Sequence, residues 1–187
     1  MIRKALHRIA DRFPLSAEDD DTMRTYYFVA PVNDRSVKEC VSTLDKWAKD
    51  SPAPIEIVLR SDGGRIDSGL WFVEEVRHIA NSHDVFTRAA GLTASMAGVM
   101  LQAGTERVIG HESRLHLHPP SASVWDSVHV IGEVYDRLME QYEQIIGIYA
   151  SRSKLTADQI RAEVDARADW YLSSQEALDA GFVDAIF

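Results

Sequence analysis

The residue types in this chain that could carry out chemistry begin with one serine at a predicted turn. Ser95 lies among small residues, between an apolar run at 85–90 and a short apolar segment at 99–104 that ends in glycine. These patterns predict a strand, a turn and a short buried helix. Because the first turn of a helix has free N–H groups, a hydroxyl here would lie beside a site that stabilises an anion. The alternative is that Ser95 only packs against a crowded helix start.

Two histidines follow on a predicted strand. Residues 113–118 alternate so that His116 and His118 share one face and two leucines share the other. A proline pair at 119–120 ends the strand, so His118 lies at its end. Either histidine could act as a base, and the spacing does not choose between them. Two histidines two residues apart could also bind a metal, but no third ligand of suitable type is nearby in the sequence.

A glycine pair and a carboxylate complete the set. Gly63 and Gly64 follow a predicted strand, where glycines permit positive φ and expose N–H groups to a ligand oxygen. Asp169 precedes a short strand at 170–172, where a lone carboxylate is usually a surface or capping group. Acyl transfer needs a nucleophile, a base, an orienting group for the base and donors for the oxyanion. Ser95, one of the two histidines, Asp169 and the glycine turn could supply all four.

Strands and helices are predicted to alternate along the chain. This order favours an α/β fold with a mainly parallel sheet in a single domain. Asp34 or Ser36 is expected to cap the first helix and Asp67 or Ser68 the second. Capping boxes are expected to begin at Thr156 and Ser173. The strands are expected at 26–30, 55–60, 85–90, 106–110, 113–118, 170–172 and 182–187, and the helices at 34–49, 67–79, 99–104, 126–150, 156–167 and 173–180.

The helix predicted at 126–150 is long for a domain of this size, and its apolar stripe is broad. Such a face could pack against another subunit or be buried within its own chain, and both alternatives stay open. The first residues are basic and amphipathic and lead into an acidic run at 18–21. We therefore expect a flexible N-terminal tail at 1–22 and the folded catalytic domain at 23–187.

Composition excludes several classes of protein. The chain has 187 residues, of which 45% are hydrophobic, and a net charge of -9. This charge argues against general nucleic-acid binding, and no apolar run is long enough for a membrane span. The single cysteine, Cys40, excludes an intramolecular disulfide and favours a reducing compartment, so we expect a cytoplasmic protein. No cofactor-binding motif is present, and we expect neither a cofactor nor a metal.

Several short motifs in one consistent order then resemble the proteolytic subunit of the ATP-dependent Clp protease, over residues 26–187. The matching segments are Ser-Asp-Gly-Gly at 61–64, Ala-Ser-Met-Ala at 94–97, Ser-Arg-Leu-His-Leu-His at 113–118, Asp-Trp-Tyr-Leu-Ser at 169–173 and Gly-Phe-Val-Asp at 181–184.

The resemblance implies a role for each matching position. Ser95 corresponds to the nucleophile of a serine endopeptidase, and His118, the second histidine, to its general base. Asp169 corresponds to the carboxylate that orients the base. The backbone N–H groups of Gly64 and Met96 correspond to the oxyanion hole.

The resemblance also implies a fold and partners. The fold would be an α/β, Clp protease and crotonase-like spiral of ββα units, with residues 126–150 as a protruding handle helix. Members of the family form homo-oligomers of heptameric rings, often a double ring, that enclose a chamber for polypeptide substrates. They use a separate AAA+ unfoldase ATPase.

Three departures from the family pattern suggest a divergent member, such as a phage or prophage protein. Asp62 replaces a proline, residues 121–125 replace a glycine-rich segment, and Glu56 and Val58 replace aromatic residues of the unfoldase docking pocket. Alternatives are therefore a non-catalytic assembly subunit and a phage capsid-maturation protease that acts without an ATPase. An acyl-CoA hydratase or isomerase of the same broad fold is disfavoured, because it would not need a serine, histidine and aspartate.

Overall fold

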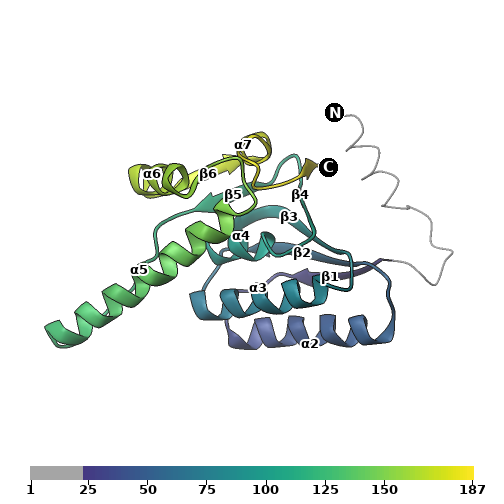
Figure 1. Ribbon diagram of the computed structural model, residues 1–187, viewed down its shortest axis with the longest axis horizontal. Coiled ribbons are helices and arrows are strands. Elements are labelled where there is room, and N and C mark those ends of the chain that lie inside the picture. The colour runs from purple at the N-terminus through teal and green to yellow at the C-terminus, as the bar shows by residue number, and fades with distance from the viewer. Residues whose placement is uncertain (1–22) are drawn as a thin grey trace.

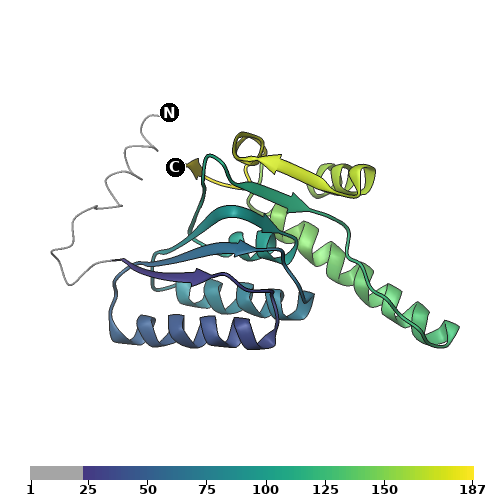
Figure 2. The same cartoon turned by 180° about the vertical axis from the view of Figure 1, so that it is seen from behind.

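The computed structural model describes residues 23–187 (Figure 1). The expected flexible tail at 1–22 lies outside the described residues. Within them, one seven-stranded sheet forms the centre of the molecule. Helices cover it, and one long helix projects away from the body in both views (Figures 1 and 2).

The sheet is parallel except at one pair of strands, as the alternating pattern predicted. Its main path runs β1-β2-β3-β4-β7, β5 pairs parallel with β3, and β6 pairs antiparallel with β5. The strands of the main path are β1 (Arg24–Phe28), β2 (Ile55–Ser61), β3 (Val85–Ala94), β4 (Glu106–Ile109) and β7 (Ala185–Ile186). The other two are β5 (Arg114–Leu117) and β6 (Trp170–Ser173).

Strand β3 is longer than the predicted 85–90 because it pairs with two different strands in turn. Its first part pairs with β4 from Phe86 to Ala89, and its last part pairs with β5 from Leu92 to Ala94. Gly91, with φ +71°, lies between the two parts. The second part carries the chain directly into Ser95 and places β5, with its two histidines, beside it.

The helices of the described residues fall into separate groups around the sheet (Figures 1 and 2). They are α2 (Asp34–Asp50), α3 (Ile66–Ala80), α4 (Met96–Leu101), α5 (Val128–Ala150), α6 (Ala157–Arg167) and α7 (Ser174–Ala180). Helices α2 and α3 lie side by side below the sheet, whereas α6 and α7 flank β6 (Figures 1 and 2). The spiral of ββα units with a protruding handle helix is confirmed, with α5 as the handle.

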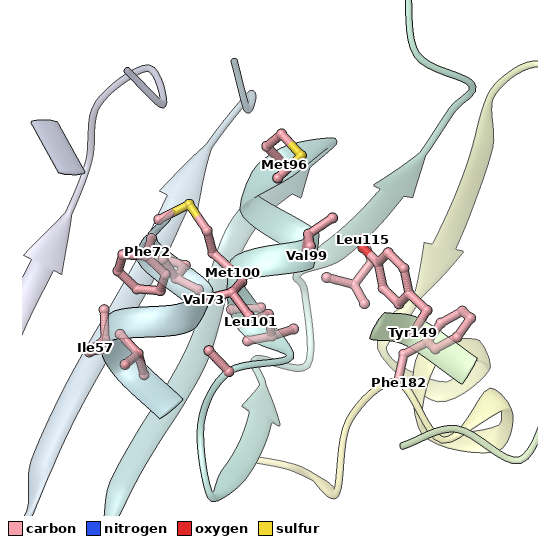
Figure 3. Close-up of a cluster of buried hydrophobic side chains, with 14 of the residues drawn as sticks. Ile57, Phe72, Val73, Met96, Val99, Met100, Leu101, Leu115, Tyr149 and Phe182 are labelled. Carbon is pink, nitrogen blue, oxygen red and sulfur yellow. The ribbon is translucent and has the colours of Figure 1, made fainter. Parts of the chain in front are cut away.

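Helix α4 is the centre of the core. All six of its residues are buried, as its small and apolar composition requires. Figure 3 shows α4 between Phe72 of α3 on one side and Tyr149 of α5 on the other. This helix spans Met96–Leu101, with Gln102 as its C-cap, so the predicted bounds of 99–104 were wrong. Gly104 instead packs against the hydroxyl of Thr87.

Two predicted helix caps were also wrong. The N-cap of α2 is Asn33, whose extended backbone lets its side chain accept from the N–H of Ser36. Helix α3 follows Arg65, which makes no capping bond, because the glycine turn leads straight into the helix. The predicted cap Ser68 lies inside α3 and donates to Asp34 instead.

The two predicted capping boxes are confirmed. Thr156 and Gln159 exchange side-chain and backbone hydrogen bonds at the start of α6. Ser173 and Glu176 do the same at the start of α7, where Gly181 ends the helix in the left-handed conformation with φ 79°.

Helix α5 has two different halves. The C-terminal half packs in the core through Tyr142, Ile146 and Tyr149, all buried. In the N-terminal half, Val128 and Tyr135 of the apolar stripe are exposed. Burial within the chain therefore accounts for only half of the stripe. Within residues 23–187, no helix combines the length and the apolar composition that a membrane crossing requires.

Candidate active site

Ser95 lies at the turn between β3 and α4 in a backbone conformation that is rare for a serine. Its φ is 52° and its ψ is -126°, and its side chain makes no capping bond to α4. A non-glycine residue at positive φ costs free energy and persists only where its surroundings impose it. Here the Ser95 N–H donates to the carbonyl of His116, with 2.8 Å between nitrogen and oxygen. The surrounding structure therefore holds the Ser95 hydroxyl at a sharp turn, directly before the start of α4.

The glycine turn packs directly on this serine. Gly63 has φ 94°, and a Cβ added there would lie 2.6 Å from the Cβ of Ser95 and 2.8 Å from the carbonyl oxygen of Ala94. Gly64 has φ 151°, and a Cβ there would collide with the carbonyl oxygen of Val32. Glycine is therefore required at both positions, for space as well as for conformation.

A chain of backbone hydrogen bonds fixes the glycine turn. The Val32 N–H donates to the Gly63 carbonyl, and the Arg65 N–H donates to the Val32 carbonyl, both at 2.8 Å. The Ser61 hydroxyl accepts from the Gly63 N–H at 3.1 Å and donates to the Ala30 carbonyl at 2.6 Å. The turn thus rests on the segment after β1 and is held in one place beside Ser95.

A pocket of about 100 Å³ joins several of the predicted site residues. Ser95, His118, Gly64 and Met96 all line it. The rest of its wall is mostly apolar and aromatic, from Ile66, Val99, Leu117, Pro120, Tyr142, Ile145, Ile146, Tyr149 and Val164, together with the polar Ser121. This volume is smaller than the ~150 Å³ of an apolar cavity that takes up benzene, so the pocket has room for at most one side chain.

The tyrosines of this pocket are neutral groups. Burial raises the pKa of Tyr142, and its hydrogen bond to Asp165, 2.9 Å between oxygens, raises that pKa further. Burial likewise raises the pKa of Tyr149. These two tyrosines therefore stay uncharged across the physiological range. The helical stripe predicted that these residues are buried, but nothing in the sequence placed them beside Ser95.

His118 is oriented by the backbone. Its Nδ1 lies 2.6 Å from the carbonyl oxygen of Pro119. Because a carbonyl can only accept, this contact requires the proton on Nδ1. In the neutral imidazole, Nε2 is then the free acceptor. His118 is the histidine that lines the pocket, and its tautomer is the one that a general base needs.

His116 is the histidine that contacts Asp169. Its Nε2 lies 2.7 Å from Oδ1 of Asp169. Its ring stacks on Tyr171, with 4.0 Å between centroids and 4° between planes. The rings of His116 and His118 are 5.2 Å apart. In this conformation, the structure gathers Ser95, His118, Gly64 and Met96 at the pocket and pairs Asp169 with the neighbouring histidine.

Tyr171 and the Pro119 carbonyl are parts of the site that sequence reasoning missed. The antiparallel register of β5 and β6, with His116 opposite Tyr171, explains the stacked ring. Alternation along 170–173 could have indicated that Tyr171 faces the histidines. Among the described residues, no group of three or more His, Cys, Asp or Glu side chains is arranged to hold a metal ion.

The fold and the site define a class of protein. A parallel α/β sheet delivers a strained serine to a helix start, beside a rigid glycine turn and a histidine with a free acceptor nitrogen. This is the arrangement of a serine hydrolase, in which backbone N–H groups face the oxygen of an attacked carbonyl.

Comparison with known proteins identifies the family. The sequence profile of the Clp protease family matches residues 21–187, so the chain belongs to that family. It is similar to ATP-dependent Clp protease proteolytic subunit 1 of Leifsonia xyli, with 30% identity over 87% of this chain and 82% of the relative. It is also similar to proteolytic subunit 2 of Tropheryma whipplei, with 31% identity over 83% of this chain and 86% of the relative. Family membership supports a serine peptidase function.

Proposed function

We propose that the protein is a serine endopeptidase that hydrolyses peptide bonds with Ser95 as nucleophile. The observation that carries this proposal is the position of Ser95, strained at the start of α4 and lining one pocket with His118. His118 is the general base, Asp169 is the carboxylate of the triad, and the N–H groups of Gly64 and Met96 bind the oxyanion. The names of the relatives support the same activity.

The proposed reaction follows from these positions. Nε2 of His118 accepts the Ser95 proton as the hydroxyl oxygen attacks the scissile carbonyl carbon. The negative oxygen of the tetrahedral intermediate accepts hydrogen bonds from Gly64 and Met96. His118 then gives its proton to the leaving amine, and an acyl-enzyme remains on Ser95. Water, activated by His118, hydrolyses that ester and restores the enzyme.

The pocket supports a preference for an apolar side chain in the substrate. Its wall away from Ser95 and His118 is formed mainly by aliphatic and aromatic groups, with Ser121 as a polar member. Burial of an apolar side chain there is favourable, by about 25 cal/mol for each Å² removed from water. A charged side chain would lose its hydration without gaining a partner. The substrates are therefore expected to be polypeptides with an apolar residue at the cleaved bond.

The activity is proposed to operate in a cytoplasmic homo-oligomer. The exposed apolar half of α5 is a surface that a second subunit could cover, and its exposure supports assembly into a heptameric ring, single or double. Sedimentation velocity measures this directly. Ile131→Asp on the exposed stripe should reduce assembly, whereas Glu140→Gln on the same helix should not. Monomeric wild-type protein at micromolar concentration would contradict the assembly proposal.

An AAA+ unfoldase ATPase is the proposed partner for folded substrates, since the relatives are named ATP-dependent. One observation favours a second candidate, a capsid-maturation peptidase that acts without an ATPase. Glu56, which replaces a docking aromatic, is buried and bonded to Arg88 at 2.7 Å. A polar pair at this position would weaken an apolar docking contact. Hydrolysis of a folded substrate with and without a bacterial unfoldase distinguishes the two.

The central experiment is the intact mass of the protein after treatment with a fluorophosphonate. We expect one adduct on each wild-type chain, none on Ser95→Ala, and one on Ser123→Ala, a control at an exposed serine. Circular dichroism should show the same fold for all three. A folded wild-type protein without an adduct would count against the peptidase and in favour of a non-catalytic assembly subunit.

A further inference from the structure

We propose that His116 is a positioning residue that holds Asp169 away from His118, so that the triad is incomplete until Asp169 is released. This inference rests on the proposed function, because it concerns the carboxylate of the same triad. In the resting arrangement, Asp169 pairs with His116. In the engaged arrangement, its carboxylate moves to His118.

The pair has one fixed side and one movable side. The His116 side chain is only 12% exposed and is stacked on Tyr171. The Asp169 side chain is 63% exposed. An exposed carboxylate has space to rotate, whereas a stacked and buried ring does not. His116 is therefore the anchor of the pair, and Asp169 is the group that can exchange partners.

The backbone before Asp169 supports two positions of its carboxylate. Ala168 ends α6 with φ 58° and ψ -37°, a strained conformation for a residue other than glycine. Relaxation of this residue changes the direction of the next side chain. The histidine rings are 5.2 Å apart, so the change of partner needs only a short displacement of the carboxylate.

His118 has a weaker partner in the resting arrangement. Its Nδ1–H donates to the Pro119 carbonyl, which fixes the ring and its tautomer. A carbonyl carries no full charge, so it stabilises the imidazolium formed during catalysis less than a carboxylate does. The His118 ring is therefore oriented as a base, but its imidazolium form lacks the stabilisation that a carboxylate would give. In the engaged arrangement, the carboxylate of Asp169 replaces the Pro119 carbonyl as the acceptor of the His118 Nδ1–H and supplies the missing charge.

A double-mutant cycle on the rate of fluorophosphonate labelling tests this inference. We expect His116→Leu to raise the labelling rate several-fold, because it frees Asp169. Asp169→Asn should lower the labelling rate of the His116→Leu variant by about tenfold or more, and should lower the wild-type rate by a clearly smaller factor. His116→Gln keeps a donor for Asp169, and its rate should stay near that of wild type. Equal costs of Asp169→Asn in both backgrounds would overturn the inference.

Nuclear magnetic resonance of the imidazole groups gives a readout that does not depend on hydrolysis. Asp169→Asn should shift the ring signals of His116 more than those of His118. The matched control is Glu133→Gln, which should shift only His129, its partner at 3.2 Å. If Asp169→Asn shifted the His118 signals more than the His116 signals, and Ser95 were still labelled, the inference would be overturned and the proposed function would stand. Absence of labelling in every folded variant would instead overturn the proposed function and, with it, the inference.

Discussion

The guanidinium of Arg107 binds both carboxylate oxygens of Asp184 and thereby fastens the end of the chain to the sheet. Its Nη2 lies 2.7 Å from Oδ1, and its Nε lies 3.0 Å from Oδ2. The Arg107 N–H also donates to Oδ2 at 2.8 Å. Because the Arg107 side chain is only 3% exposed, this ion pair is screened little by solvent on its cationic side. It holds β7 beside β4, next to the end of α4.

This ion pair predicts a loss of stability in acid. Burial opposes ionisation of Asp184, but the hydrogen bonds and charge of Arg107 outweigh it and lower the pKa of Asp184. Its contribution to stability is thus present above its ordinary pKa of about 4 and is lost as the pH falls through the lowered value. Urea unfolding measures the free energy of unfolding at pH 7 and at pH values from about 4 to 2. This free energy should fall less with pH for Asp184→Asn than for wild type. An equal fall for Asp184→Asn and wild type would contradict this.

The ion pair between Glu56 and Arg88 predicts that removing one partner lowers the free energy of unfolding more than replacing both. The Glu56 side chain is 5% exposed, and Arg88 contacts both of its carboxylate oxygens, at 2.7 and 3.1 Å. Arg88→Met leaves a buried, unpaired carboxylate and should cost about 3–5 kcal/mol of unfolding free energy. Replacing both residues, Glu56→Leu with Arg88→Met, should restore most of that loss. A double variant as unstable as Arg88→Met alone would show that the packing of Arg88 matters more than its charge.

Substitution of Gly63 is predicted to reduce both the activity and the stability of the protein. In Gly63→Ala the new methyl group collides with Ser95, and φ stays at 94°, so we expect a cost of at least about 1–3 kcal/mol and strongly reduced labelling of Ser95. The matched control is Gly147→Ala on α5, where nothing lies within 4 Å of an added Cβ. That variant should gain about 0.5–1 kcal/mol, because alanine favours a helix. Thermal unfolding and labelling measure both effects, and unchanged labelling of Gly63→Ala would exclude the predicted contact.

The burial of Cys40 predicts that its thiol reacts only when the protein opens. It is fully buried on α2, and burial raises its pKa, so little reactive thiolate is present. We expect a thiol reagent to modify Cys40 only as fast as the chain opens, and the rate should increase with urea. Cys40→Ser should abolish the reaction and serves as the blank. Rapid modification of the native protein would mean that α2 is less well packed than the structure shows.

Much of the fold could be predicted because it depends on local patterns. Apolar periodicity located the strands and helices, and the capping boxes of α6 and α7 follow from residues three positions apart. The cap of α2 was missed because Asn33, Asp34 and Ser36 are all good capping residues. Only the extended backbone of Asn33 decides among them. The length of β3 was missed because its second half pairs with β5, which no local pattern reveals.

The site could be predicted in part, because some of its features also depend on local sequence patterns. The turns at Gly63 and Ser95 are properties of adjacent residues, so their positions between a strand and a helix followed from the sequence. The partner of Asp169 did not, since Asp169 and His116 are 53 positions apart. Alternation placed both histidines on one face of β5, and it could not show which of them a distant carboxylate would contact.

The contact between Gly63 and Ser95 also limits how the site can open. The two turns lie so close that a Cβ added to Gly63 would collide with Ser95, and each is held by a backbone hydrogen bond to a neighbouring segment, so they can move only together. Any change in the shape of the pocket must therefore come from its opposite wall, which α5 and the segment after His118 form. The sheet side of the pocket is therefore the fixed side, and changes in the pocket's width depend on the helical side.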